Sequence, residues 1–574
     1  MRQSKSRLSR HFAFKLSFFL IAFCLQTLLF ASNPPLTQPE DGLQPIKTYI
    51  FHGWETLTRA MTRCDSVSDP KLSAPSILYL PADLTIPSSV QKLQSDCKVE
   101  VRHLPEVIRQ PGQVDTSKFQ PHGLLFLENS YVVPGGRFNE MYGWDSYFII
   151  LGLLSDGKVS LARGMVENFF FEIEHYGTVL NANRTYFLSR SQPPFLTSMI
   201  LAVYQAMKSS PHPDQAWLAR AYAFASRDYE MWNREPHRAG ATGLSRYFDH
   251  GEGPVAEGLQ DENGYYRTVT SYFLHHPENS GELTELKSDQ NTQDVPGFMF
   301  TLQLCESTPS GQKCDPFKMF SLSRDYYKGD RSMRESGFDI SFRFGPYGAQ
   351  THHYAPVCLN SLLYKTETDL AQMAELLGKK SDVTKWQRLA EERKQRVNQY
   401  LWDAERGRFY DYNFETQTRS TYDYATTFNP LWAGLATPEQ AQSVQSHLAI
   451  FEQPGGLAMS RTETGVQWDL PYGWAPIQLL TIQGLRRYRF QNDADRLSYK
   501  FLSTVAENFR RDGTIREKYN VITRSSETNV TTGYKANVVG FGWTNGVFLE
   551  LLRELPPEWV NRLAREQGAS QPAK

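Results

Sequence analysis

The chain has 574 residues, of which 40% are hydrophobic, 13% aromatic and 21% charged, so it can bury a large core and is not expected to be disordered. Its 61 basic and 62 acidic residues give a formal net charge of −1, which leaves no field of one sign to attract nucleic acid or an anionic membrane. We therefore expect a small neutral ligand, no nucleic-acid partner and a monomer.

The first predicted element is an export signal at residues 1–32. Basic residues precede an apolar run from Leu16 to Phe30, and small and Pro-containing residues follow it. The run is shorter than the roughly 20 residues that a membrane span needs. We therefore expect removal of the signal, no stable membrane insertion afterwards, and a periplasmic or secreted protein. An uncleaved anchor is the alternative.

Residues 33–115 form a predicted N-terminal extension, rich in Pro and Ser and with a strand-like run at 77–80. Export would permit disulfides, and the candidate pairs are Cys64 with Cys97 and Cys305 with Cys314, although the sequence cannot fix the connectivity. No cysteines have the short spacing of metal ligands, so we expect no metal and no cofactor.

Residues 116–560 have the pattern of paired amphipathic helices joined by aromatic and acidic loops. Apolar residues at helical spacing fill 370–377, where Gly378 can end the helix, and a second helix is predicted over 383–401. Long strand-rich segments are absent, which argues against a parallel sheet with a nucleotide crevice. The pattern favours an all-α fold, either a barrel of helix pairs or a solenoid, followed by a polar tail at 561–574.

Three stretches concentrate groups that suit a sugar: 134–147, 181–194 and 467–476. Each combines aromatic faces with side chains that donate and accept several hydrogen bonds, as a neutral polyol requires. Buried turns or solvated loops are the competing interpretation of each stretch taken alone.

Two carboxylates stand in complementary settings. Asp339 follows the apolar Phe338, which favours the protonated acid, whereas Glu517 lies between the cations Arg516 and Lys518, which favour the ionised form. Cleavage of a glycosidic bond needs one carboxyl group of each kind. Taken singly, either carboxylate could be an ordinary ion-paired residue.

Other chemistries have weaker support. No nucleophile elbow, phosphate loop or dinucleotide fingerprint occurs in a strand-to-helix setting. His352 and His353 are adjacent and cannot share a helix face as a metal-binding pair would, so we interpret them as ordinary loop residues.

Taken together, these stretches resemble the trehalase family of glycoside hydrolases. The segments 134–147 and 467–476 look like its two signatures, and the resemblance extends over about 120–555. It implies an (α/α)6 barrel and inverting hydrolysis of α,α-trehalose to two glucose molecules. By this match Asp339 would be the general acid and Glu517 the general base acting through water. Further residues would bind the sugar: Arg137, Trp144, Asp145, Asn181, Arg190, Ser191, Gln192, Glu257 and Gly337.

The sequence departs from the family at two loops. Many members have Arg-Pro-Glu where this chain has Val255-Ala256-Glu257, and a glutamate ends a Gly-rich loop where this chain has Tyr534-Lys535. Both changes would weaken binding of the leaving glucose. We therefore predict a raised KM and tolerance of substrates that are altered in the leaving ring. The alternatives are a related α-glycosidase with another leaving group and a non-catalytic sugar-binding protein.

Overall fold

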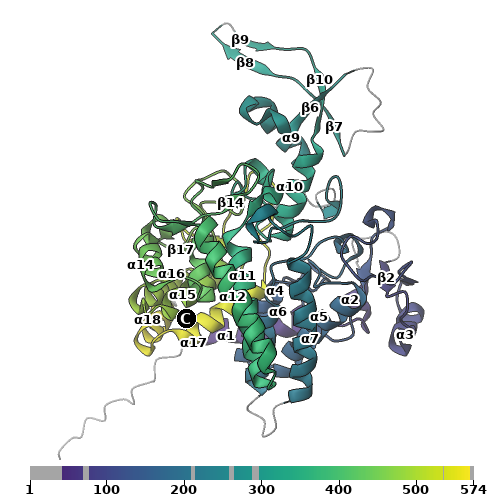
Figure 1. Cartoon of the computed structure of the whole chain (residues 1–574), viewed down its shortest axis with the longest axis vertical. Helices are drawn as coiled ribbons and strands as arrows, with labels where there is room; N and C mark the ends of the chain where they lie inside the picture. The colour runs from purple at the N-terminus through teal and green to yellow at the C-terminus, as the bar shows by residue number, and fades with distance from the viewer. Residues whose placement is uncertain are drawn as a thin grey trace, which may run out of the picture. The chain divides into compact units, whose positions relative to one another are not determined.

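Helices dominate the computed structural model, which describes residues 42–68, 76–207, 214–257, 264–287, 297–309, 311–533 and 535–568 (Figure 1). The predicted signal at 1–32, Tyr534 and the end of the polar tail lie outside these residues. The described residues belong to one compact unit that spans 41–574.

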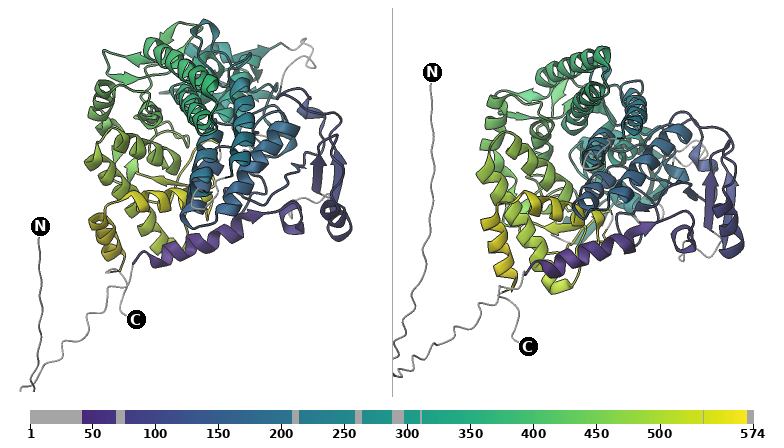
Figure 2. Two further views of the ribbon diagram at one scale, coloured as in Figure 1. Left: turned by 60° about the horizontal axis from the view of Figure 1, so that its bottom comes forward. Right: turned by 90° about the horizontal axis from the view of Figure 1, so that it is seen from below.

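An inner ring of helices forms the centre of the fold. Each inner helix contacts the next, and the last one closes the ring against the first: α4 (Asp145–Ser155), α6 (Leu196–Met207), α11 (Val357–Leu376), α13 (Asn429–Ala433), α15 (Ala475–Arg487) and α17 (Gly542–Glu554). Figure 2 follows these helices around the ring from blue through green to yellow. The predicted (α/α)6 barrel is confirmed, and a solenoid is excluded because α17 returns to α4.

An outer layer covers the ring. Its helices are α5 (Val159–His175), α7 (Gln215–Trp232), α12 (Lys380–Tyr400), α14 (Pro438–Ser446) and α16 (Gln491–Asp512), with α18 (Pro557–Gly568) against α16. The helix α1 (Gln44–Leu57) comes from the predicted N-terminal extension and packs against α17. The extension therefore supplies one helix to the barrel wall.

Local sequence explains the helix ends and the ring closure. The predicted boundary at Gly378 is confirmed, since α11 ends at Leu376 and Gly378 has a φ of +71°, which favours glycine. Gly152 of α4 and Gly546 of α17 face each other, and a Cβ on Gly546 would lie 2.0 Å from the carbonyl oxygen of Phe148. Glycine at this crossing allows the two helices to touch and the ring to close.

Short strands connect the helices. The predicted strand at 77–80 is β2 (Ser76–Leu80), which pairs in parallel with β3 (Val99–His103) and β4 (Leu124–Leu125) beside the helix α3 (Ser88–Asp96). The remaining ladders between helices are short: β1 (Thr58–Arg59) with β5 (Tyr131–Val132), β11 (Tyr354–Ala355) with β14 (Tyr412–Asn413) and β15 (Thr418–Arg419), β12 (Trp402–Asp403) with β13 (Arg408–Phe409), β16 (Glu452–Gln453) with β17 (Gly456–Leu457), and β18 (Tyr472–Trp474) with β19 (Lys518–Asn520).

The helix α10 (Arg324–Glu335) is preceded by a strand-rich insertion. The sequence analysis did not predict this insertion. After α9 (Tyr265–His275), the strands β6 (Leu283–Leu286), β7 (Met299–Leu302) and β10 (Lys318–Leu322) form an antiparallel sheet, and β8 (Cys305–Thr308) pairs with β9 (Gly311–Cys314) as a hairpin. Figure 1 shows this sheet at the top of the view, beyond the ring of helices.

Both candidate disulfide pairs are present. Cys64 is bonded to Cys97 and Cys305 to Cys314, while Cys358 is buried with a free thiol. Among the described helices, none combines the length and the apolar character needed to cross a bilayer.

Candidate active site

One pocket lies where the inner helices begin. Asp145 is the first residue of α4, Trp543 is the second of α17, and Trp474 directly precedes α15. Since the inner helices alternate with antiparallel outer helices, their N-terminal ends all point to one end of the ring. The loops before these helices supply the lining: Pro134, Arg137, Phe138, Tyr142, Trp144, Asp145, Asn181, Tyr186, Phe187, Arg190, Gln192, Glu257, Arg334, Gly337, Asp339, Gln467, Trp468, Trp474, Glu517, Phe541 and Trp543.

The structure brings all but one of the predicted site residues to this lining. Those that line it are Asp339, Glu517, Arg137, Trp144, Asp145, Asn181, Arg190, Gln192, Glu257 and Gly337. Ser191 does not line it, because its hydroxyl donates to the carbonyl of Val179, at 2.6 Å. The individual roles in binding and catalysis remain predictions.

Aromatic rings form the apolar part of the pocket. Trp468 and Trp474 are stacked with 4.0 Å between ring centroids and 5° between planes. Trp144 packs against Trp468, Phe338 and Trp543 at 5.6–5.8 Å. These flat faces can cover the apolar faces of a pyranose ring, and their mutual packing holds them in place.

Gly337 lets the segment that carries Asp339 approach this aromatic cluster. Its φ is +75°, and a Cβ at this position would lie 2.9 Å from the indole of Trp144. Any larger residue would therefore be strained and would displace the indole.

Three hydrogen bonds join the Asp339 loop to the predicted signature at 467–476. The side chain of Gln467 donates to the carbonyl of Asp339, and the amide of Trp468 donates to the carbonyl of Ile340, at 3.1 Å. In return, the amide of Phe342 donates to the carboxylate of Asp469, at 3.0 Å. The two motifs, distant in sequence, therefore position the candidate acid together.

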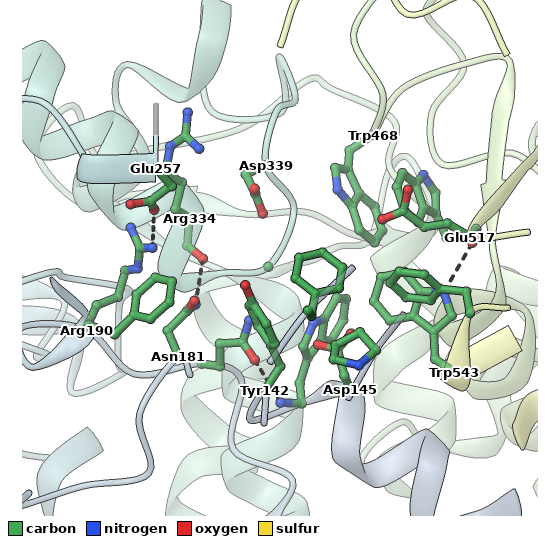
Figure 3. Close-up of a pocket in the computed structure, with 18 of the residues that line it drawn as sticks. Tyr142, Asp145, Asn181, Arg190, Glu257, Arg334, Asp339, Trp468, Glu517 and Trp543 are labelled. Carbon is green, nitrogen blue, oxygen red and sulfur yellow. Dashed lines mark hydrogen bonds and ion pairs between the residues drawn. The ribbon is translucent and has the colours of Figure 1, made fainter. Parts of the chain in front are cut away.

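Glu517 is held in a different manner. Its carboxylate accepts a hydrogen bond from the ammonium of Lys518, at 2.9 Å, and both side chains are buried. Its main-chain carbonyl accepts from the indole of Trp543, at 3.1 Å. In the view of Figure 3, the carboxyl groups of Asp339 and Glu517 lie on either side of the Trp468 ring.

A third carboxyl group, Asp145, faces the same space. Burial raises the pKa of Asp145 well above its usual range, and the negative charges of Glu517 and Asp339 raise it further. This electrostatic coupling places the three groups around one pocket. A protonated Asp145 can both donate and accept hydrogen bonds to sugar hydroxyls.

Arginine side chains and Glu257 line the opposite part of the pocket. Arg190 donates to Glu257 in a short ion pair, and Asn181 donates to the carbonyl of Arg334, at 3.5 Å (Figure 3). Burial raises the pKa of Glu257, but the charges of Arg190 and Arg334 outweigh it and leave this pKa below its ordinary value. Glu257 is therefore an ionised acceptor.

Glu335 supports the site from behind. Its carboxylate accepts from the amides of Ser191, at 3.1 Å, and Phe248, at 2.6 Å, and it contacts the ring of His237. Glu335 is only four residues before Asp339 in the sequence, but it does not line the pocket. It ties the loop that carries Arg190 to the end of α10.

Of the two positions at which the sequence departs from the family, Val255 lies within the described residues and Tyr534 does not. Val255 is buried in a small hydrophobic cluster with its amide bonded to the hydroxyl of Tyr266, so its side chain does not line the pocket. On this side Arg334 supplies a guanidinium group in addition to that of Arg190, and the sequence analysis missed Arg334 because it lies on an apparently solvated polar helix. Tyr534 lies outside the described residues.

Comparisons with known proteins agree with this geometry. The family model "Trehalase" matches residues 67–292 and 321–556. The unmatched interval contains β7, β8 and β9 of the strand-rich insertion.

Curated relatives and a solved structure extend the match. A "Probable trehalase" of Eremothecium gossypii is 36% identical over 89% of this chain and 72% of its own length. A "Cytosolic neutral trehalase" of Saccharomyces cerevisiae is 35% identical over 86% of this chain and 69% of its own length. The structure of a neutral trehalase from Saccharomyces cerevisiae aligns with a TM-score of 0.72 at 33% identity, covering 93% of this chain and 96% of that one.

These relatives correct the prediction of export. Relatives from Kluyveromyces lactis, Saccharomyces cerevisiae and Neurospora crassa are named as cytosolic, so the assignment to the periplasm or the exterior is wrong. A basic start followed by a short apolar run was too weak a pattern to fix the compartment.

Proposed function

This chain belongs to the trehalase family of glycoside hydrolases and hydrolyses trehalose to glucose, and we propose that it does so with inversion, using Asp339 as general acid and Glu517 as general base. The observation that supports the pair is their convergence on one pocket that also presents aromatic faces and hydrogen-bonding side chains.

In the proposed reaction, Asp339 protonates the oxygen of the glycosidic bond while Glu517 removes a proton from the attacking water. The ammonium of Lys518 donates to the carboxylate of Glu517 and so orients it in the pocket. Phe338, the residue before Asp339, packs against Trp144 and Trp468 and so helps to position the loop that carries the acid. After one turnover a proton has moved from water to the leaving sugar, and exchange with solvent restores both groups.

The remaining lining groups hold the substrate. Asp145 and Gln192 lie beside Trp144, where they can bind the ring that is attacked, while Arg190, Glu257 and Arg334 face the other part of the pocket. We propose a monomer as the active unit, in which a single chain carries both catalytic carboxyl groups and the sugar-binding groups.

Replacement of each carboxylate tests the assignment. Asp339→Asn and Glu517→Gln should each lower kcat for trehalose by about 10²–10⁴-fold, the usual contribution of a general acid or base. Glu375→Gln, an exposed change on α11, is the control and should retain full turnover. Near-normal turnover in either folded active-site variant would refute the assignment.

A sugar panel separates the alternatives. Glucose release from trehalose, maltose and kojibiose should show a clear preference for trehalose. A preference for maltose or kojibiose would indicate a related α-glycosidase, whereas no hydrolysis at all would indicate a binding protein.

A further inference from the structure

Two histidines and an aspartate meet outside the pocket lining. His352 and His353 lie in the one-turn helix η7 (Thr351–His353), with 3.9 Å between their ring centroids. Their Nε2 atoms lie 3.0 and 3.6 Å from the same Oδ1 atom of Asp325, in the first turn of α10. Adjacent histidines can therefore converge on one ligand position without sharing a helix face, because a tight turn directs both side chains to Asp325.

The spacing fits a metal ion. Tetrahedral zinc has nitrogen and oxygen ligands at about 2.0–2.2 Å, which places neighbouring ligand atoms roughly 3.3 Å apart. The two measured nitrogen-to-oxygen distances lie on either side of this value, and the three ligand atoms all lie within 4.8 Å of one another. An ion can therefore enter with small side-chain movements.

Within the described part of the chain, only one of the two ring nitrogens of His352 has a polar contact. The residue is 5% exposed, and its Nδ1 atom has no hydrogen-bond partner within the part of the chain that the structure describes. Both a structural and a metal-bound histidine normally pair the second ring nitrogen, so the free Nδ1 does not distinguish the two roles. Here the polar contact of the ring is made by Nε2, the atom that faces Asp325 and His353.

The cluster is also open and negatively charged at one side. The Asp325 side chain is 53% exposed, so solvent can supply a further ligand. Glu282 lies on this side too, since its carboxylate accepts a hydrogen bond from the hydroxyl of Ser323, the residue that caps α10, at 3.2 Å.

We propose that Asp325, His352 and His353 bind a divalent transition-metal ion, with zinc as the preferred ion. Two imidazoles and one carboxylate are a common zinc ligand set, whereas magnesium and calcium prefer oxygen ligands throughout. The ion would fasten the start of α10 to η7, the two ends of the segment that carries Gly337 and Asp339. Its role is structural, because these three residues do not line the active pocket.

Calorimetric titration of the chelator-treated full chain with zinc chloride tests the site. The unchanged protein should bind one ion per chain, and zinc should raise its Tm by a few degrees, while kcat for trehalose stays the same with and without the ion. Asp325→Asn and His353→Gln should each weaken zinc binding by at least about 10-fold, because each removes one ligand. His52→Gln, an exposed change on α1, should bind zinc as the unchanged protein does.

Two results would overturn the site. One is the lack of saturable zinc binding by the unchanged protein, and the other is unaltered affinity in both ligand variants. If the variants fail to fold, anomalous diffraction at the zinc edge from crystals of the unchanged protein decides instead. A peak between the three side chains supports the proposal, and no peak there contradicts it.

Discussion

The segment that carries Asp339 and the segment that carries Glu517 are stabilised in opposite ways. Asp339 lies beside aromatic rings, and hydrogen bonds from residues 467–469 fix its main chain. Glu517 instead has a buried cation in direct contact with its carboxylate. The difference shows that the two candidate catalytic carboxyl groups have unlike surroundings within one pocket, as their two proposed roles require.

Removing the cation should have the largest effect on this contrast. Lys518→Met removes the hydrogen bond that orients the carboxylate of Glu517. We expect kcat/KM to fall by about 10–100-fold at neutral pH, a loss of roughly 1.4–2.7 kcal/mol, with a larger change in kcat than in KM.

Lys500→Met is the matched control, because Lys500 forms an ion pair with Glu452 at 2.7 Å and neither residue lines the pocket. Both variants can lose stability, but kcat should fall in Lys518→Met alone. An unchanged kcat there would show that Lys518 does not position Glu517.

Weakening a hydrogen bond that holds the Asp339 loop should have a smaller effect on activity. Asp469 accepts hydrogen bonds from the amide of Phe342 and the hydroxyl of Thr464, at 3.0 and 2.7 Å. Asp469→Asn should lower kcat by about 10-fold, because one displaced hydrogen bond shifts the Asp339 loop. Asp403→Asn is the control, since Asp403 also accepts a backbone amide, that of Arg406, but this bond does not involve the Asp339 loop.

The free energy of unfolding of Asp469→Asn should also depend on pH differently from that of the unchanged protein. Burial raises the pKa of Asp469 to about 6, above the value near 3.9 in an unfolded chain. Between these values the folded protein holds a proton that the unfolded chain has lost, so this group's contribution to the free energy of unfolding falls as pH rises from about 4 to 6. Denaturant titrations of Asp469→Asn should lack this component, and an identical pH slope in both proteins would contradict the argument.

A change on the leaving-sugar side should affect substrate binding and leave turnover nearly unchanged. Arg334→Ala removes a guanidinium from the part of the pocket that contains Glu257. We expect KM for trehalose to rise by roughly 10-fold, consistent with the loss of one hydrogen bond to a charged group, with little change in kcat. Analogues altered in the leaving ring should lose less affinity in this variant than trehalose does.

Arg388→Ala, an exposed change on α12, is the control. The sequence analysis predicts that KM is raised already in the unchanged protein. A low-micromolar KM with strict rejection of every altered leaving ring would show that Arg334 or other residues restore this side of the site.

The sequence predicted the local parts of this molecule better than its long-range contacts. Helical spacing placed α11 and α12, and family motifs brought most of the site residues together. Arg334 was missed because a charged residue on a polar helix resembles a solvated face until another loop packs over it. The insertion was missed because its short, half-exposed strands lack a clear alternation. Ser191 was grouped with the sugar ligands, but its hydroxyl is bonded to a main-chain carbonyl.

Early proton NMR spectra of trehalose hydrolysis test most directly whether Glu517 activates a water molecule while Asp339 protonates the leaving group. Inversion at the attacked carbon gives one β-glucose from that ring and one α-glucose from the leaving ring. The first spectra, recorded before mutarotation, should therefore show the two anomers in equal amounts. Spectra with α-glucose alone would indicate retention through a covalent intermediate and would contradict the assignment of Glu517 as a base acting through water.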